Sequence, residues 1–266
     1  PAPSKESRLP VRITINHPPK MRSSNPALKD NVFLADQSVS ASGTMTINGT
    51  VNKTAILLLL LILPAFWVWD KINGAENPSV YYPWMIGGAI GGFILALVTI
   101  FKKTAAPYTA PLYAICEGLF VGAISAFFER MYPGIVFQAT ILTFGTLFAL
   151  LIAYRSGMIR ATENFKLGVA AATGGIFLIY MATWILGMFS VSIPFIHDSG
   201  LIGIGFSLFV VVIAALNLVL DFDFIENGAK AGAPKYMEWY AAFGLLVTLI
   251  WLYIEMLRLL SKLNRR

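Results

Sequence analysis

The sequence predicts an all-α polytopic membrane protein, a bundle of seven transmembrane helices. Of its 266 residues, 57% are hydrophobic and only 13% are charged, whereas a soluble domain is about 45–50% apolar. Several stretches approach the roughly 20 apolar residues that a helix needs to cross a hydrocarbon core about 30 Å thick. Tyrosine and tryptophan gather near the ends of these stretches, where amphipathic rings meet the headgroups.

Seven spans follow one another along the chain, and connecting loops separate them. The first is short and contains Pro64, so we expect it to borrow flanking residues or to kink. The predicted spans are Thr54–Trp69, Tyr81–Phe101, Pro107–Phe128, Ile135–Tyr154, Leu167–Phe189, Ser199–Leu220 and Trp239–Leu260.

The region before the first span differs in kind. Residues 1–53 are rich in proline, serine and asparagine and contain no apolar run long enough to cross a membrane, which predicts a flexible tail. Residues 1–20 precede Met21 and lack the apolar centre of a signal peptide. We interpret them as an upstream extension or an artificial addition, with the native start at Met21. The transmembrane domain is expected to cover residues 54–262.

Basic residues predict the orientation of the bundle. The even-numbered connections carry seven Lys or Arg, against two in the odd-numbered ones, and basic residues remain on the cytoplasmic side. The N-terminus is therefore predicted to be cytoplasmic. Seven crossings then place the basic C-terminus outside, which conflicts with its Arg258 and Lys262. We favour a full crossing by the last span, because it is long enough; the alternative is a segment that enters the membrane and turns back.

Motifs of soluble enzymes and of nucleic-acid binding are missing from the sequence. Its two histidines, His17 and His197, exclude a paired-histidine zinc motif such as HExxH, and there is no nucleophile elbow or Walker A loop. The basic residues flank apolar segments and form no run with interleaved aromatics. We expect neither an enzyme nor a nucleic-acid partner, and no cofactor.

Small residues four apart predict close helix packing. In lipid, such pairs let two helix backbones approach each other. The pairs are Gly87 with Gly91, Gly88 with Gly92, and Gly118 with Gly122.

One acidic residue, Glu117, lies near the middle of a predicted span. A charged carboxylate at this depth costs about 2.5–3.5 kcal/mol, so we expect it to be protonated, paired or facing water. Tyr113, one turn earlier, is placed to hydrogen-bond it. Glu255 and Arg258 lie three residues apart near the end of the last span. Mutual pairing with snorkelling explains this spacing about as well as a functional role does.

Four polar residues lie in the segment "LNLVLDFDFIENGAK" at the end of span six. At 100° per residue, Asn217 and Asp221 share one helix face, whereas Asp223 shares the opposite side with Glu226. We expect Asn217 and Asp221 to face the bundle as a polar stripe. Asp223 and Glu226 are expected to face water, with Glu226 able to pair with Lys230.

These features, taken in order, resemble the Bax inhibitor-1 family, in its bacterial branch. The resemblance rests on the seven spans, on the acid-bearing end of span six, on the link "ENGAKAGAPKYMEWY" and the ending "IEMLRLL", and on "NPALKDNVFL" and "GTMTINGTVNKT" in the tail. It covers roughly Met21 to Leu260. The resemblance implies a helical bundle in the bacterial inner membrane, with a pH-sensitive calcium leak in several members.

In those members, a carboxylate at the end of helix six pairs with a second one in helix seven. Asp221 matches the first. When the last span is aligned from its ending "LRLL", Val247 and Thr248 stand where the second carboxylate is expected. The resemblance therefore implies only half of the pair here, and Glu117 and Glu255 are the candidate substitutes for the missing partner.

The leading hypothesis is a Ca²⁺ leak channel whose closure depends on protonation of Asp221, with Glu117 as a second proton-sensing candidate and Asn217 as a further residue of the same ion- or proton-sensing site. Carboxylate oxygens suit a hard cation that binds transiently at Asp221. Secondary candidates are Asp223, Glu255, Thr248 and Tyr113. The alternative is a non-conducting regulator that binds another membrane protein, such as a membrane-bound protease, through its exposed tail.

Overall fold

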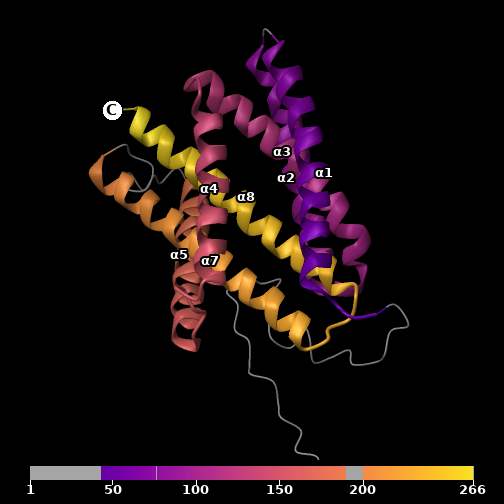
Figure 1. Cartoon of the computed structure of the whole chain (residues 1–266). Coiled ribbons are helices and arrows are strands. Elements are labelled where there is room, and N and C mark those ends of the chain that lie inside the picture. Colours follow the sequence, from indigo (N-terminus) through magenta and orange to yellow (C-terminus); the bar gives the residue numbers. More distant parts are fainter. Residues whose placement is uncertain (1–42, 76, 190–199, 266) are drawn as a thin grey trace, which may run out of the picture.

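The computed structural model describes residues 43–75, 77–189 and 200–265, and these form an all-helical bundle (Figure 1). Seven helices are long and apolar enough to cross a membrane, which confirms the predicted fold class. Two short 3-10 turns, η2 (Pro78–Val80) and η3 (Lys103–Ala105), precede the second and third long helices. The long helices are α1 (Ile47–Asn73), α2 (Tyr81–Phe101), α3 (Ala106–Met131), α4 (Ile135–Arg155), α5 (Glu163–Met188), α7 (Leu201–Lys230) and α8 (Met237–Asn264).

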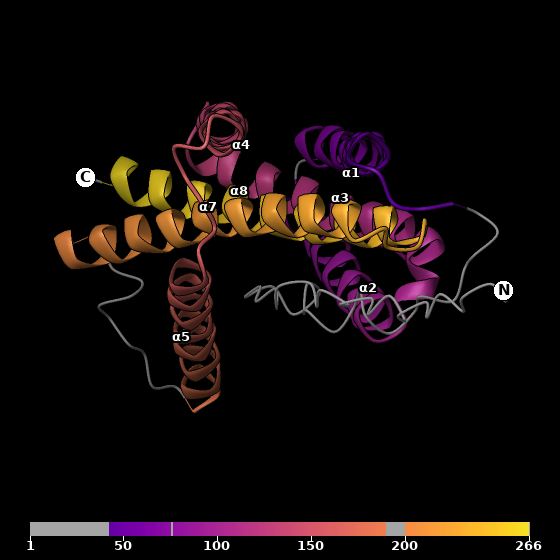
Figure 2. The ribbon, with the colours of Figure 1, turned by 60° about the horizontal axis from the view of Figure 1, so that its bottom comes forward.

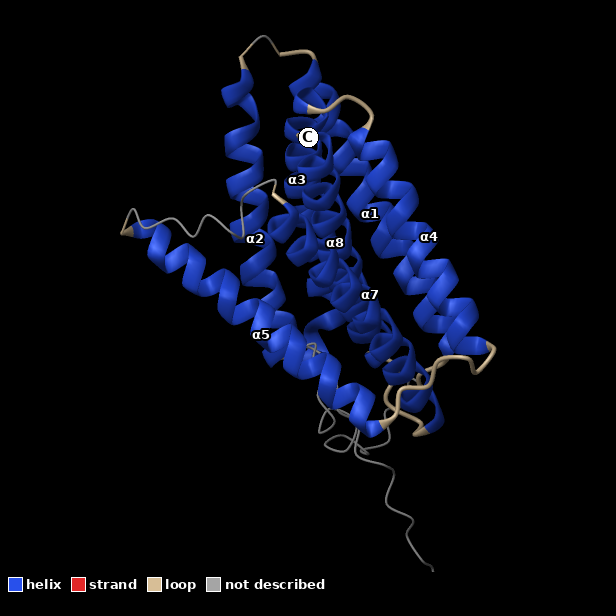
Figure 3. Cartoon of the chain, turned by 90° about the vertical axis from the view of Figure 1, so that its left-hand side faces the viewer, coloured by secondary structure: helices blue, strands red, loops and turns tan. Residues whose placement is uncertain are grey.

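The last helix, α8, forms the core of the bundle. It packs against α7, α1, α4 and α3 and is the most buried of the seven, and in Figure 3 the other helices stand around it. It runs from Met237 to Asn264 without a break, so it is one long helix and does not turn back. The helix ends fall into two groups. We call the side where α1 and α8 begin the Glu238 end, and the opposite side the Trp69 end.

Close backbone contacts join α3 to its neighbours α1 and α2, which lie beside it in Figure 2. A Cβ added at Gly118 would overlap the Leu61 carbonyl oxygen of α1, and one at Gly122 would overlap the Ala65 carbonyl oxygen. Gly88 of α2 meets α3 backbone in the same way. Gly88, Gly118 and Gly122 therefore do what their spacing predicts, because only a missing side chain lets the backbones come this close. The prediction fails for Gly87, which faces open space, whereas Gly91 and Gly92 meet side chains of α3.

The helix α5 is the one most exposed at the surface of the bundle. Only Lys166, Val169 and Ile176 are buried along it. It packs on α7 and diverges from the other helices towards its C-terminal end (Figure 3). Its attachment therefore depends on few side chains.

The bundle begins earlier in the chain than expected. The first helix starts at Ile47, not at Thr54, and it continues past Pro64 to Asn73, so it does borrow flanking residues on both sides. Before it, the Met45 amide donates to the Ala233 carbonyl oxygen at 2.7 Å, and the Met45 side chain is buried. Residues 43–53 thus belong to the folded part. The rest of the expected tail, with the proposed start at Met21, lies outside the described residues, as does His197.

A buried carboxylate holds the start of α1 to the start of α8. Glu238 is fully buried and accepts hydrogen bonds from the Thr46 amide at 3.0 Å and the Thr46 hydroxyl at 2.9 Å. Lys53 and Lys235 each approach it to 2.7 Å. Thr46 also caps α1 through the Gly49 amide. A negative charge at a helix N-terminus is favourable, and a Cβ at Gly49 would overlap the carboxylate.

We predict that Glu238→Gln destabilises the bundle more than Thr46→Ala does. The Thr46 change removes a helix cap worth about 1 kcal/mol. The Glu238 change leaves two lysines without their counter-ion and weakens charged hydrogen bonds, for a loss of about 2 kcal/mol or more. Thermal unfolding in detergent, followed by tryptophan fluorescence, measures both. Asp70→Asn, at an exposed position of α1, is the control; equal midpoints for Glu238→Gln and this control would contradict the prediction.

Candidate functional site

A polar stripe lies on the buried face of α7. Asn217 is 3% exposed and Asp221 is 1% exposed, and the two residues are about one helical turn apart. The Asn217 amide donates to the Thr173 hydroxyl of α5 at 2.9 Å and to the Ile213 carbonyl oxygen at 2.8 Å. Both side chains therefore point into the protein, as the helical spacing predicted.

The antiparallel pair α7 and α8 determines which part of α8 lies at the depth of Asp221. Asp221 precedes the end of α7 at Lys230 by about 14 Å of helix rise. The same rise from the start of α8 at Met237 leads to Leu246, and Val247 and Thr248 lie within about 3 Å of rise beyond it. Thr248 is 3% exposed, and its hydroxyl donates to the Gly244 carbonyl oxygen at 3.3 Å. Glu255 lies about 10 Å further along α8. No acidic residue of α8 thus lies at the depth of Asp221.

Glu255 has its own partners near the Trp69 end. It is 1% exposed and accepts from the Tyr180 hydroxyl of α5, with 3.1 Å to each carboxylate oxygen, and from Arg258 at 2.9 Å. The Arg258 guanidinium also stacks on the Tyr180 ring, 5.0 Å from its centroid. The mutual pairing of Glu255 and Arg258 considered from their spacing is therefore present.

Glu117 lies between α2 and α3. A Cβ at Gly92 of α2 would overlap its carboxylate. Tyr113 is 4% exposed and interacts with the Glu117 carboxyl group, as expected for residues one turn apart. The Tyr113 ring also packs edge-on against Phe243 of α8, with centroids 4.8 Å apart. Glu117, Asp221 and Glu255 are therefore carried by three different helices and occupy different environments.

The expectation that Asp223 faces water is corrected by its contacts. Its side chain is only 18% exposed and pairs with Lys166 of α5 at 2.8 Å. Lys166 lies in the first turn of α5 and is itself buried, so it needs an anion inside the protein. Glu226 is 35% exposed; it pairs with Lys230 at 2.5 Å, as predicted, and accepts from the Tyr154 hydroxyl at 2.6 Å.

Three residues of α5 form a contact set that the sequence analysis missed. Lys166, Thr173 and Tyr180 are seven residues apart and therefore share one face of the helix. They bind Asp223, Asn217 and Glu255, respectively. We call these three residues the α5 polar face. Hydrogen bonds between helices contribute to association in lipid, where apolar burial does not drive it. The seven-residue spacing of polar residues within an apolar span was the available signal.

No group of three or more His, Cys, Asp or Glu side chains that could hold a metal ion is found among the described residues. Asp221 as a calcium ligand, together with the roles assigned to Asn217 and Glu117, remains a prediction from the sequence.

The comparison with protein families gives one match. A family model described as Bax inhibitor 1 like matches residues 25–265, which is most of the chain. No curated protein and no solved structure matches.

We predict that Asp223→Ala loosens the first turns of α5. The change removes the closer counter-ion of the buried Lys166, at 2.8 Å, and leaves only the exposed Glu163 at 3.4 Å; a buried charge that loses such a partner is costly. Backbone amides of residues 163–170 should exchange with deuterium several-fold faster than in the unmodified protein. Asp70→Asn, at an exposed position of α1, is the control and should leave α5 unchanged. Identical exchange of residues 163–170 in Asp223→Ala and the unmodified protein would contradict the anchoring role.

Proposed function

The chain belongs to the Bax inhibitor 1 like family, and from this premise we propose that it is a pH-sensitive leak pathway for cations, with Ca²⁺ as the ion. Asp221 is the proton-sensing residue in this proposal. Asn217 and Thr173 line the same polar region.

The observation that supports this proposal is the burial of an ionisable residue inside a membrane bundle. Asp221 is 1% exposed, among the mostly apolar residues that form the buried face of α7. Ionisable residues within spans are costly and usually serve ion or proton pathways. A protonated Asp221 suits a closed, dry bundle. An ionised Asp221 favours the entry of water and of a cation, so protonation biases the equilibrium between a closed and an open state.

The chemistry of the region favours a hard cation. Carboxylate, amide and hydroxyl oxygens are the ligands that Ca²⁺ prefers in proteins. In this family the paired acid is expected on the last helix, where this chain has Val247 and Thr248. We therefore propose that the α7 carboxylate of Asp221 is the main source of the pH dependence in this chain. Glu117 is the second proton-sensing candidate.

The proposal includes an orientation. Lys102 follows α2, Arg155 ends α4 and Lys235 precedes α8, all at the Glu238 end. The positive-inside rule favours a cytoplasmic location for that end. The protein would then be a multi-pass protein of the bacterial inner membrane with its N-terminus in the cytoplasm.

We predict that Asp221→Asn abolishes the pH dependence of calcium flux. Asparagine keeps the size and polarity of the side chain but cannot change its charge. Purified protein in liposomes that contain a calcium-sensitive dye is assayed from pH 5 to pH 8. The unmodified protein should show pH-dependent flux, whereas Asp221→Asn should show a flux that varies little with pH.

The matched control for this assay is Asp70→Asn, which makes the same chemical change at an exposed position of α1. It should retain the pH response. If the unmodified protein gives no flux above empty liposomes at any pH, the leak proposal is wrong, and a non-conducting regulator that binds another membrane protein is favoured. If Asp221→Asn keeps the full pH response, the assignment of Asp221 is wrong.

A further inference from the structure

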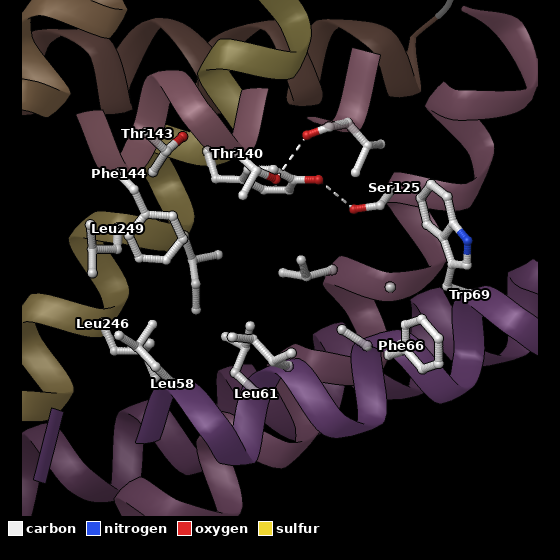
Figure 4. A pocket seen from close by; sticks show the side chains of 17 residues that line it. Leu58, Leu61, Phe66, Trp69, Ser125, Thr140, Thr143, Phe144, Leu246 and Leu249 are labelled. Atoms are coloured by element: carbon white, nitrogen blue, oxygen red, sulfur yellow. Dashed lines mark hydrogen bonds between the residues drawn. The ribbon is translucent and has the colours of Figure 1, made fainter. Parts of the chain in front are cut away.

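A cavity of about 510 Å³ lies on the side of α8 that faces α1, α3 and α4. Its volume falls within the roughly 300–1,000 Å³ of small-molecule sites. Figure 4 shows the side chains around it, with Leu58 and Leu61 of α1 opposite Thr140 and Thr143 of α4, and with Leu246 and Leu249 of α8 forming part of the wall. It uses none of the acidic residues of the proposed leak pathway.

The surface of this cavity is apolar. Four lining residues carry hydroxyl groups, and all four are engaged within the protein. Ser125 and Tyr253 are bonded to each other at 2.7 Å. Thr140 donates to the Val136 carbonyl oxygen at 2.8 Å, and Thr143 donates to the Ala139 carbonyl oxygen at 2.7 Å. An apolar cavity whose hydroxyl groups are already satisfied offers few partners to an ordered water, and a hydrocarbon suits it better.

The cavity reaches the lipid-facing surface along α1. Two of its lining residues on that helix, Ile62 and Phe66, are 47% and 70% exposed. The helices α1 and α4 both pack on α8 and α3, and they stand apart on the same side of α8 in Figure 2. The acyl chain of a lipid in the bilayer can therefore enter the cavity from the side, without passing through the bundle.

The length of the cavity matches one leaflet of the membrane. It extends along α1 from Leu58 to Trp69, which is about 16 Å of helix rise. Half of a hydrocarbon core about 30 Å thick is about 15 Å. Trp69 lies at the outer end of this range, and tryptophan prefers the headgroup level of the membrane. An acyl chain whose headgroup lies near Trp69 would end near Leu58.

From the shape, lining and position of this cavity, we propose that it binds one acyl chain of a phospholipid from the leaflet at the Trp69 end. The lipid acyl chain fills the cavity, which would otherwise leave the buried wall of α8 without packing partners. It thereby fixes the distance between α1 and α4.

The test uses the full-length protein in phosphatidylcholine nanodiscs that contain a phosphatidylcholine with a photoreactive diazirine on its acyl chain. Labels on the outward surfaces of α1 and α4 are uninformative, since bulk lipid reaches them. The informative residues are Leu246, Leu249 and Ile250 of α8, which are at most 8% exposed and line the cavity. Labelling of these residues, located by mass spectrometry of peptides, is expected in the unmodified protein.

Two filling variants reduce the space from opposite walls, Val136→Phe on α4 and Leu58→Trp on α1. Each should lower the labelling of Leu246–Ile250 several-fold. Val98→Phe is the matched control, because Val98 is 41% exposed on α2 and does not line the cavity; it should leave the labelling unchanged.

Three results would overturn the proposal. The first is no labelling of α8 in the unmodified protein, and the second is labelling that neither filling variant reduces. The third is labelling by a diazirine fatty acid that an excess of phosphatidylcholine does not displace, which would identify a free fatty acid as the occupant. Because the readout is independent of calcium flux, failure of the leak proposal does not affect it.

Discussion

The need to satisfy buried charges within the protein shapes this bundle more than any other constraint. A carboxylate or ammonium group in the hydrocarbon region has no bulk water to solvate it, so it must meet a protein partner. Glu238 meets Thr46, Lys53 and Lys235, and Glu255 meets Tyr180 and Arg258. The first set of contacts links the start of α1 to the start of α8, and the second links α5 to α8 through the Tyr180–Glu255 hydrogen bonds.

The central helix α8 therefore has two chemically different sides. Glu255 lies on the side that faces α5, where the α5 polar face supplies hydroxyl and ammonium groups to α7 and α8. The other side, which carries Leu246 and Leu249, borders the apolar cavity beneath α1 and α4. A polar route and a lipid-accessible cavity can thus exist in one bundle without sharing side chains, because α8 separates them.

The sequence predicted those features of the structure that depend on interactions between residues close together in the chain. The number of spans follows from apolar length, and the inward direction of Asn217 and Asp221 follows from helical spacing. The Glu226–Lys230 pair is likewise an interaction between residues four apart. Interactions between distant parts of the chain were not predictable in this way. The partners Lys166 and Asp223 are 57 positions apart, and Thr46 and Glu238 are 192 positions apart. No pattern along one helix identifies such a partner, so the early start of the bundle and the burial of Asp223 emerged only from the structure.

The central claim is that Asp221 exchanges a proton as the leak opens and closes. The most direct measurement is the infrared difference spectrum of the protein in lipid between acidic and neutral pH, in the region where protonated carboxyl groups absorb. The account predicts a carboxyl band that is lost in Asp221→Asn and that titrates over the same pH range as the calcium flux. If Asp221→Asn leaves the difference spectrum unchanged, or if the Asp221 band titrates while the flux stays constant, the claim is contradicted.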